Sequence, residues 1–382
     1  MDVNDTFKTL LQRGYAIPFI NHQPDDRYKM KNLDYGMTIG NAITKGGRQF
    51  VCWVGGGDSP KAFFLLSYSD DDAVTWTEPV LVIDPHDTTL LCDRSTLVGT
   101  LWVDPENRLW LFFNQSLEQF DGRSSNWFIR CDDPDSSKLV WTEPRYISYG
   151  CTLNKPIVMD NGEWVLPVSL WTRRYISKPF SDCYHQLDSE RMAHLYVSSD
   201  RGESWTRRGG VVFPQSQFDE HMCVQLKDGR LWMIARTETV LMEAFSDDRG
   251  ATWTEPLEAR IQSVPARFHL RRLRSGRILL VKNGCLLHER PENRSFMTAF
   301  LSDDEGLSWS EGFVLDERHE VSYPDSAEGE DGMIYITYDR NRSKDGEILM
   351  ASLREEDILL GRIHTRGALV GRVIRKPGKL CT

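Results

Sequence analysis

The feature that most constrains this chain is a short motif, Ser-x-Asp-x-Gly-x-Thr/Ser-Trp, that recurs along it. Full copies span 198–205, 246–253 and 302–309, a near copy with Ala in the Gly place spans 69–76, and a degenerate copy runs from 131 to 141. Asp and Ser side chains bond nearby backbone amides and Gly accepts a positive φ, so each copy predicts a tight turn. We expect the Trp to cover the hairpin and to pack between neighbouring repeats.

A second repeat precedes each copy of the first along the chain. Six times a polar turn leads into an apolar strand, starting at Lys45, Pro105, Asp160, Asp228, Ser275 and Asp331. We call the Ser-x-Asp-x-Gly-x-Thr/Ser-Trp motif the Asp box, or simply the box. Together with the hairpin that carries a box, each unit of about 50–65 residues supplies four strands, and such units close radially into a propeller. The sequence therefore predicts an all-β, six-bladed β-propeller of four-stranded antiparallel blades.

We expect the whole chain, 1–382, to form this single propeller domain, since no linker divides it. The sixth unit has a strand hairpin but no box, so the last blade should lack the motif. An apolar run at 15–20, within the N-terminal segment 1–33, should pair with the last blade and close the ring.

Composition narrows the partners and the compartment. The net charge is -10 and no Lys/Arg run is long, which argues against nucleic acid and membrane surfaces as partners. The N-terminus lacks the features of a signal peptide, so we expect a cytoplasmic protein, or a secreted or periplasmic one if a leader was removed. The eight cysteines are scattered without a CxxC pair, which is typical of buried free thiols. No metal spacing is visible and no cofactor is expected, while the oligomeric state stays open.

Both kinds of turn should lie at one end of the propeller. The other end then collects the starts of the first strands, the ends of the second strands and the start of one third strand. These positions are rich in polar groups: Asp34, Tyr35, Asp93, Arg94, Asn154, Lys155, Glu220, His221, Arg267, His269, Tyr323, Asp325, Asp58, Asn114, Arg173, Arg236, Asn283, Asp339 and Arg294. Such convergence predicts a site for a charged, hydroxyl-rich ligand, which points to a carbohydrate.

On these motifs the chain resembles the sialidase (neuraminidase) superfamily over roughly residues 34–360. The segment 219–237 is similar to the one in which a Glu precedes a hairpin that ends in an arginine, which places Glu220 and Arg236. The segment 293–309 is similar to the one carrying another substrate-binding arginine, here Arg294. The segment 321–339 matches the one with the nucleophilic tyrosine, here Tyr323, and 55–71 occupies the place of the acid/base loop, here Asp58.

The resemblance implies a retaining release of a terminal acidic sugar, such as sialic acid. Arginine forks would bind the sugar carboxylate, which an anionic nucleophile would repel and a tyrosine hydroxyl would not. Glu220 would take the proton of Tyr323, and Asp58 would protonate the leaving oxygen and later activate water.

The chain departs from the family at the start of its first blade. The family places an arginine about ten residues before the first turn, and here Gly36 or Met37 stands there. Arg94, Arg267 or Arg27 could replace it in space, and His221 near the mouth could contact the ligand or orient a neighbour. Two alternatives therefore stay open: hydrolysis or elimination of another acidic sugar such as a uronic acid, and a non-catalytic carbohydrate-binding propeller.

Overall fold

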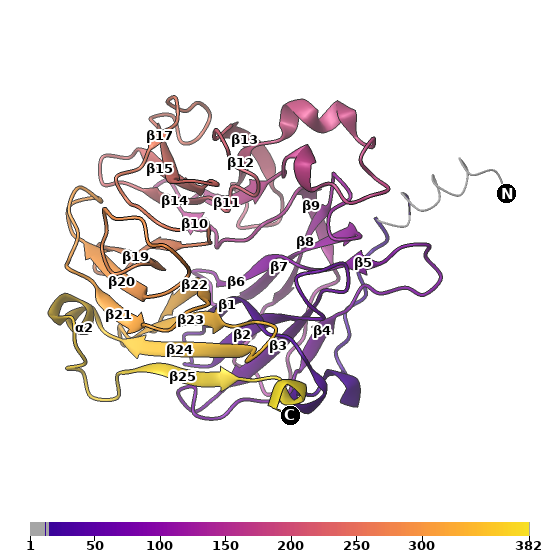
Figure 1. Cartoon of the computed structure of the whole chain (residues 1–382), viewed down its shortest axis with the longest axis horizontal. Coiled ribbons are helices and arrows are strands. Elements are labelled where there is room, and N and C mark those ends of the chain that lie inside the picture. Colours follow the sequence, from indigo (N-terminus) through magenta and orange to yellow (C-terminus); the bar gives the residue numbers. More distant parts are fainter. Residues whose placement is uncertain (1–11, 13–14, 382) are drawn as a thin grey trace.

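Six antiparallel sheets follow one another around a central axis in the computed structural model, which describes residue 12 and residues 15–381 (Figure 1). Their strands, blade by blade, are β1 (Met37–Ile43), β2 (Gln49–Gly55), β3 (Phe63–Ser69) and β4 (Leu81–Ile83); β5 (Arg94–Ser95), β6 (Gly99–Val103), β7 (Leu109–Leu117), β8 (Ser125–Cys131) and β9 (Arg145–Tyr149); β10 (Ile157–Val158), β11 (Trp164–Ser169), β12 (Ala193–Ser198) and β13 (Thr206–Val211); β14 (Met222–Gln225), β15 (Leu231–Arg236), β16 (Leu241–Ser246) and β17 (Leu257–Glu258); β18 (His269–Arg272), β19 (Ile278–Asn283), β20 (Met297–Ser302) and β21 (Phe313–Asp316); β22 (Val321–Glu328), β23 (Ile334–Arg340), β24 (Glu347–Leu353) and β25 (Leu369–Arg375). The predicted six-bladed all-β propeller is confirmed.

Blade two carries one irregularity in its inner strand. Both β5 and β6 pair with β7, where Arg94 is opposite Leu117 and Gly99 is opposite Phe113. The inner strand is thus broken into two pieces on one partner. The blade keeps its four strand positions around the axis.

The core lies between the blades. The second strands β2, β7 and β11 are buried along their whole length, because blades cover them on both faces. Trp102, Trp110 and Phe112 of blade two pack in one cluster with Trp164 and Leu166 of blade three. Two-sided burial explains why these strands read as short continuous apolar runs rather than alternating patterns.

The recurring motif forms the turn that its residues predict. In the copy at 246–253, Ser246 Oγ donates to Asp248 Oδ1 at 2.8 Å and receives the amide of Gly250 at 2.8 Å. Thr252 donates its amide and its hydroxyl to the two oxygens of Asp248, and Trp253 Nε1 donates to Gly250 O at 3.1 Å. Gly250 has φ of 92°, a left-handed conformation that favours glycine.

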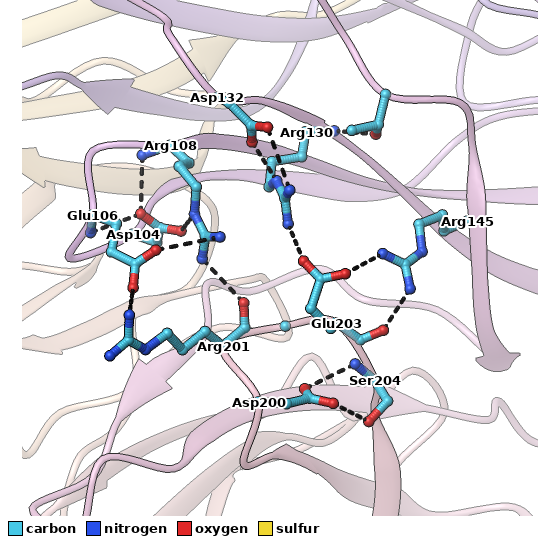
Figure 2. A network of polar contacts seen from close by, with 12 residues as sticks. Asp104, Glu106, Arg108, Arg130, Asp132, Arg145, Asp200, Arg201, Glu203 and Ser204 are labelled. Carbon is cyan, nitrogen blue, oxygen red and sulfur yellow. Dashed lines mark hydrogen bonds and ion pairs between the residues drawn. The ribbon is translucent and has the colours of Figure 1, made fainter.

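Charged side chains fasten the turn of blade three to the preceding blade. Figure 2 shows the contact of blade two with the turn of blade three, where Glu203 binds Arg130 and Arg145 at 2.7 Å each. Arg108 donates to the backbone oxygen of Arg201 at 3.0 Å, and Arg201 in turn binds Glu106. This turn therefore fixes the spacing between blades two and three as well as the hairpin that carries it.

The predicted pairing of the run 15–20 with the last blade is wrong, although Tyr28 and Leu33 of the N-terminal segment 1–33 pack in one cluster with Ile374 of blade six. Residues 1–11, 13 and 14 of this segment lie outside the described residues. Blade six is built entirely from residues 321–375, and Asn21 instead forms a bridge with Val82 at the outer edge of blade one. The backbone oxygen of Ala16 accepts from Gln115 of blade two at 2.8 Å. An apolar run indicates that a segment is covered, but it does not say by which blade.

The C-terminal strand closes the ring instead. Arg372 donates to the backbone oxygens of Asp72 and Ala73 in the turn of blade one at 3.3 Å each, and Arg375 donates to Thr77 O. In place of a sixth box, the link between β24 and β25 contains the short helix α2 (Glu355–Leu360). None of the described helices has the length and apolarity that a membrane crossing requires.

Candidate functional site

Three predicted residues from two non-adjacent blades meet at one end of the axis. Tyr323 lies in β22 of blade six, Glu220 lies two residues before β14, and Arg236 ends β15. The Tyr323 hydroxyl donates to Glu220 Oε1 at 2.9 Å, and Arg236 donates to Glu220 Oε2 at 2.8 Å. One carboxylate thus accepts from a phenol and from a guanidinium at once.

Unusual backbone conformations hold this group. Asp219, Glu220 and Tyr323 have φ of 56°, 45° and 52°, in the left-handed region that side-chain-bearing residues rarely adopt. A register shift in β22 between Ser322 and Asp325 accompanies the turn of Tyr323 toward blade four. Such strain costs of order 1–3 kcal/mol per residue and persists only where the surrounding structure imposes it.

The electrostatics leave Glu220 ionised and Tyr323 protonated. Burial raises the pKa of Glu220, but the charge and hydrogen bond of Arg236 and the Tyr323 hydroxyl outweigh it, so the pKa lies below its usual value. Burial and the Glu220 charge raise the pKa of Tyr323, against the opposing charges of Arg236 and Arg342. The pair is therefore set as a proton donor facing a proton acceptor.

Arg294 reaches the same site from the loop between β19 and β20 of blade five. Its guanidinium donates to Ser322 Oγ at 3.2 Å and to Pro265 O at 3.2 Å. Ser322 directly precedes Tyr323 in the chain. Arg294 is thereby next to the tyrosine, and no ion pair ties it to a carboxylate of the described residues.

Arg342 also lies in this site, although the sequence did not single it out. It follows β23, and its guanidinium carbon is 4.1 Å from the centroid of the Tyr323 ring, a cation–π distance. Its Nε donates to Asp339 at 3.0 Å, and another nitrogen donates to Ser322 Oγ at 2.9 Å. The sequence prediction took ligand contacts from the ends of strands. Arg342 lies three residues beyond Asp339, in the loop that follows β23.

Asp58 stands at the rim of the site. Its side chain is 49% exposed, and one of its oxygens is 3.8 Å from Arg342. The other oxygen accepts from Gln119 Nε2 at 3.0 Å. The Asp58 charge contributes to the raised pKa of Tyr323, so the carboxylate lies within electrostatic range of the phenol.

Arg267 lies deeper, below the tyrosine. It is 2% exposed, its Nε donates to Asn154 Oδ1 at 2.9 Å, and its guanidinium carbon is 6.0 Å from the Tyr323 ring. A further nitrogen of Arg267 is 3.8 Å from Asp325, which also forms an ion pair with Lys155. Arg267 therefore belongs to a charged cluster on the axis rather than to the open mouth.

Three other predicted ligand contacts point elsewhere. His221 is 2% exposed, and its Nε2 is 2.8 Å from His194 O, which places it between blades three and four. Burial lowers its pKa to about 4. Arg94 donates to Pro85 O at 2.8 Å, and Arg27 is exposed over the ring of Tyr28. The predicted role of His221 at the mouth is therefore wrong, because its ring is enclosed.

Two cavities border this region. One of about 230 Å³ is lined by Arg236 together with Gln217, Phe218, Thr237, Glu238 and Pro265. A larger one, of about 740 Å³, follows the inner strands from Asn154 and His269 toward the turns at the opposite end. We assign the site to the first, because it contains Arg236 and the backbone oxygen that binds Arg294. Within the described chain, no group of three or more His, Cys, Asp or Glu side chains is placed to hold a metal ion.

Comparisons with known proteins agree with this architecture. No curated protein matches the chain. Among solved structures, an intramolecular trans-sialidase from Ruminococcus gnavus is similar with a TM-score of 0.64 at 12% identity, covering 89% of this chain and 98% of that one. A protein of unknown function from Dyadobacter fermentans is similar with a TM-score of 0.60 at 17% identity, covering 85% of this chain and 96% of that one.

A third similar structure is the Trypanosoma rangeli sialidase, with a TM-score of 0.60 at 13% identity, covering 81% of this chain and 53% of that one. Identities this low establish the shared propeller fold. The model of the BNR repeat-like domain matches residues 47–336, which is most of the chain. This chain therefore belongs to the BNR repeat-like domain family, and it shares its propeller fold with the sialidase structures named above.

Proposed function

We propose that this protein is a retaining glycoside hydrolase that releases a terminal acidic sugar, of the sialic acid type, from glycoconjugates. The observation that carries the proposal is the 2.9 Å hydrogen bond from the Tyr323 hydroxyl to Glu220, with Arg236 on the other carboxylate oxygen. A tyrosine of raised pKa becomes a nucleophile only beside a base, and Glu220 is that base.

In the first step the Tyr323 oxygen attacks the anomeric carbon as its proton moves to Glu220. The bond from the anomeric carbon to the leaving oxygen breaks, and Asp58 supplies the proton that the leaving oxygen takes. The product of this step is an aryl glycoside on Tyr323 and a free alcohol. The positive charge of Arg236 stabilises the negative charge on the phenolic oxygen and on the Glu220 carboxylate as the proton passes between them.

In the second step Asp58, now a carboxylate, removes a proton from water, and the water oxygen attacks the anomeric carbon. The bond to Tyr323 breaks and its oxygen recovers the proton from Glu220. Two displacements at one carbon retain its configuration. The exposed place of Asp58 at the rim gives it access to both the leaving group and water.

Guanidinium groups explain why the sugar should be acidic. Arg236 and Arg294 line the same mouth as Tyr323, and arginine forks bind carboxylates bidentately. A carboxylate nucleophile in this position would repel such a substrate, whereas a neutral phenol does not. The pairing of a tyrosine with arginines therefore favours a sugar with a carboxylate close to its anomeric carbon.

The test is hydrolysis of 4-methylumbelliferyl glycosides of N-acetylneuraminic acid and of glucuronic acid, followed by fluorescence, with wild type and Tyr323→Phe. We expect wild type to hydrolyse the sialoside and the variant to lose turnover. Hydrolysis of the glucuronide alone would move the assignment to uronides, and formation of an unsaturated uronide would indicate elimination. Binding of either sugar without any turnover would make the protein a carbohydrate-binding propeller and contradict the proposal.

A further inference from the structure

Gly36 and the loop that carries Arg342 occupy the same space. The amide of Gly36 donates to Arg342 O at 3.1 Å. A Cβ at position 36 would collide with the backbone oxygen of Gly346, so no side chain fits there while the loop keeps this path. This chain has no arginine at the start of blade one. Instead, the loop after β23 passes over Gly36 and brings Arg342 to the site.

The loop that carries Arg342 is held by its own hydrogen bonds. The backbone oxygen of Asn341 accepts the amides of Lys344, Asp345 and Gly346 at 2.9 Å each. The side-chain amide of Asn341 donates to Asp345 at 2.8 Å, and Arg340 binds the same carboxylate at 2.7 Å. The backbone of Arg342 is thus placed before any ligand arrives.

The side chain of Arg342 is placed equally firmly. Asp339, which is fully buried, accepts from its Nε at 3.0 Å, and Ser322 Oγ accepts from a terminal nitrogen at 2.9 Å. Arg294 donates to the same Ser322 Oγ at 3.2 Å, so one hydroxyl lies between two guanidinium groups. The remaining terminal nitrogen of Arg342 is 3.8 Å from Asp58 at the rim, and the side chain keeps 15% of its surface exposed.

The two guanidinium groups beside Ser322 differ in their carboxylate partners. Of Arg294 and Arg342, only Arg342 has a buried carboxylate partner, Asp339. In the described residues Arg294 has hydrogen bonds but no ion pair. Arg342 also faces the half-exposed Asp58 at 3.8 Å, so Arg294 is the one of the two guanidinium groups without a carboxylate partner in the part of the chain that the structure describes, and the carboxylate of a ligand can supply one.

We propose that Arg342 is a specificity-determining residue that binds the substrate carboxylate beside Arg294, in place of an arginine from blade one. The inference rests on the proposed function for its substrate class, an acidic sugar. It adds a contact from the sixth blade, on the loop that excludes a side chain at Gly36. Because Arg342 also stacks on Tyr323, the same residue orients the nucleophile toward the carbon that carries the carboxylate.

The experiment measures binding rather than turnover, by calorimetry, with N-acetylneuraminic acid, glucuronic acid and the neutral methyl ester of each. Wild type should prefer an acid to its ester. Arg342→Ala should weaken binding of that acid about 10- to 100-fold, as expected for a lost charged hydrogen bond, and leave the ester unchanged. Arg342→Lys, which keeps the charge but not the fork, should fall between the two.

Lys344→Ala is the matched control, because it removes one exposed positive charge from the same loop. It should bind the acid as wild type does. Equal weakening of acid and ester by Arg342→Ala, an equal loss in Lys344→Ala, or no preference of wild type for either acid would each overturn the inference. An unchanged thermal unfolding midpoint in Arg342→Lys guards against a folding defect. Carboxylate-dependent binding without hydrolysis would defeat the proposed function and leave the role of Arg342 standing.

Discussion

Glu220 carries the chemistry of the site because it is charged while almost fully enclosed. Its two oxygens each accept one strong hydrogen bond, from Tyr323 and from Arg236. Removing either donor leaves a buried carboxylate only partly satisfied, which is costly in a site shielded from water. In the proposed mechanism, Tyr323 as nucleophile, Glu220 as base and the Arg236 guanidinium act as one unit at the residue scale, so single substitutions should have large and non-additive effects.

Tyr323→Phe removes only the attacking oxygen. The ring that stacks on Arg342 remains, so binding of an acidic sugar should change little, while turnover should fall by about three orders of magnitude or more. Steady-state kinetics on the fluorogenic sialoside gives the turnover, and calorimetry gives the binding. Retention of wild-type turnover would remove Tyr323 from the mechanism.

Glu220→Gln keeps the shape of the base and abolishes its charge. We expect turnover to fall by at least about 100-fold, since general-base contributions are of that size. In wild type the pKa of Glu220 lies below its ordinary value, so the base stays ionised as pH falls through 4.5. The acid limb of kcat/KM should therefore lie below pH 4.5, and it should disappear in the variant. An acid limb that is the same in both proteins would assign it to another group.

The buried carboxyl group of Asp219 leads to a separate prediction, about how the stability of the fold depends on pH. Burial raises its pKa to about 6 from 3.8, against the hydroxyls of Ser169 and Ser216 that donate to it. A group with a raised folded-state pKa stabilises the fold below its unfolded pKa, and this contribution is lost as pH rises through about 6. Asp219→Asn should therefore gain stability relative to wild type between pH 4 and pH 7, by up to about 3 kcal/mol. Urea unfolding at both pH values measures the difference, and parallel pH curves would contradict it.

The sequence predicted the site residues that lie at strand ends and missed the one in a loop. Glu220, Arg236 and Tyr323 border strands whose order is set by the repeat, so their convergence followed from blade geometry. Arg342 depends on how the loop after β23 folds back over Gly36, which no periodic pattern encodes. His221 was misplaced for the same reason, because a strand-end position does not determine which way the ring turns.

At the scale of the element, the Asp-box turn joins local and long-range packing. Its Ser, Asp and Thr close the turn by themselves, whereas its Gly faces the preceding blade. A Cβ on Gly202 would collide with the Trp110 ring, and one on Gly306 would approach the Trp232 ring to 2.8 Å. The near copy tolerates Ala73, with φ of 61°, which shows that the backbone requirement alone does not demand glycine. The turn could be predicted from the sequence because its hydrogen bonds are local. The ring in the preceding blade that its Gly contacts could not be predicted.

Two Gly→Ala substitutions separate the two requirements. Gly229 has φ of 93° with no atom near a Cβ, so Gly229→Ala should cost only the left-handed backbone penalty, about 1–2 kcal/mol. Gly202→Ala, with φ of 87°, adds the collision with Trp110 and should cost about 1–3 kcal/mol more. Chemical denaturation of both variants measures the difference. Equal losses would mean that blade three can move away from blade two without penalty.

At the scale of the whole molecule, the ring is closed by side chains of the last strand on the turn of the first blade. The prediction of six blades held because the repeat of a polar turn and an apolar strand occurs six times, whereas the Ser-x-Asp-x-Gly-x-Thr/Ser-Trp motif occurs five times. The predicted pairing of the run 15–20 was mistaken because this run lies on blades one and two. Arg375 is central to the closure, since its guanidinium is 5.6 Å from the Trp53 ring and 5.7 Å from the Trp76 ring. The contact therefore joins blade six to the buried aromatics of blade one.

Arg375→Ala should loosen this closure. The loss of two ring contacts and of the hydrogen bond to Thr77 should cost about 1–3 kcal/mol, and Arg372→Ala, whose contacts are 3.3 Å backbone bonds at the surface, should cost less. Thermal unfolding ranks the two variants. Hydrogen exchange should locate the Arg375→Ala effect in β25 and in the turn of blade one. A uniform change across all six blades would contradict closure at this seam.

The bond between Tyr323 and Glu220 joins blade six to blade four, with blade five between them. In repeat proteins each unit contacts mainly its neighbours, so a contact across an intervening unit depends on the number of units. Here the insertion or deletion of one unit between residues 220 and 323 would change the angle at which the phenol meets the carboxylate. The proposed reaction therefore requires one complete blade, blade five, between these two positions.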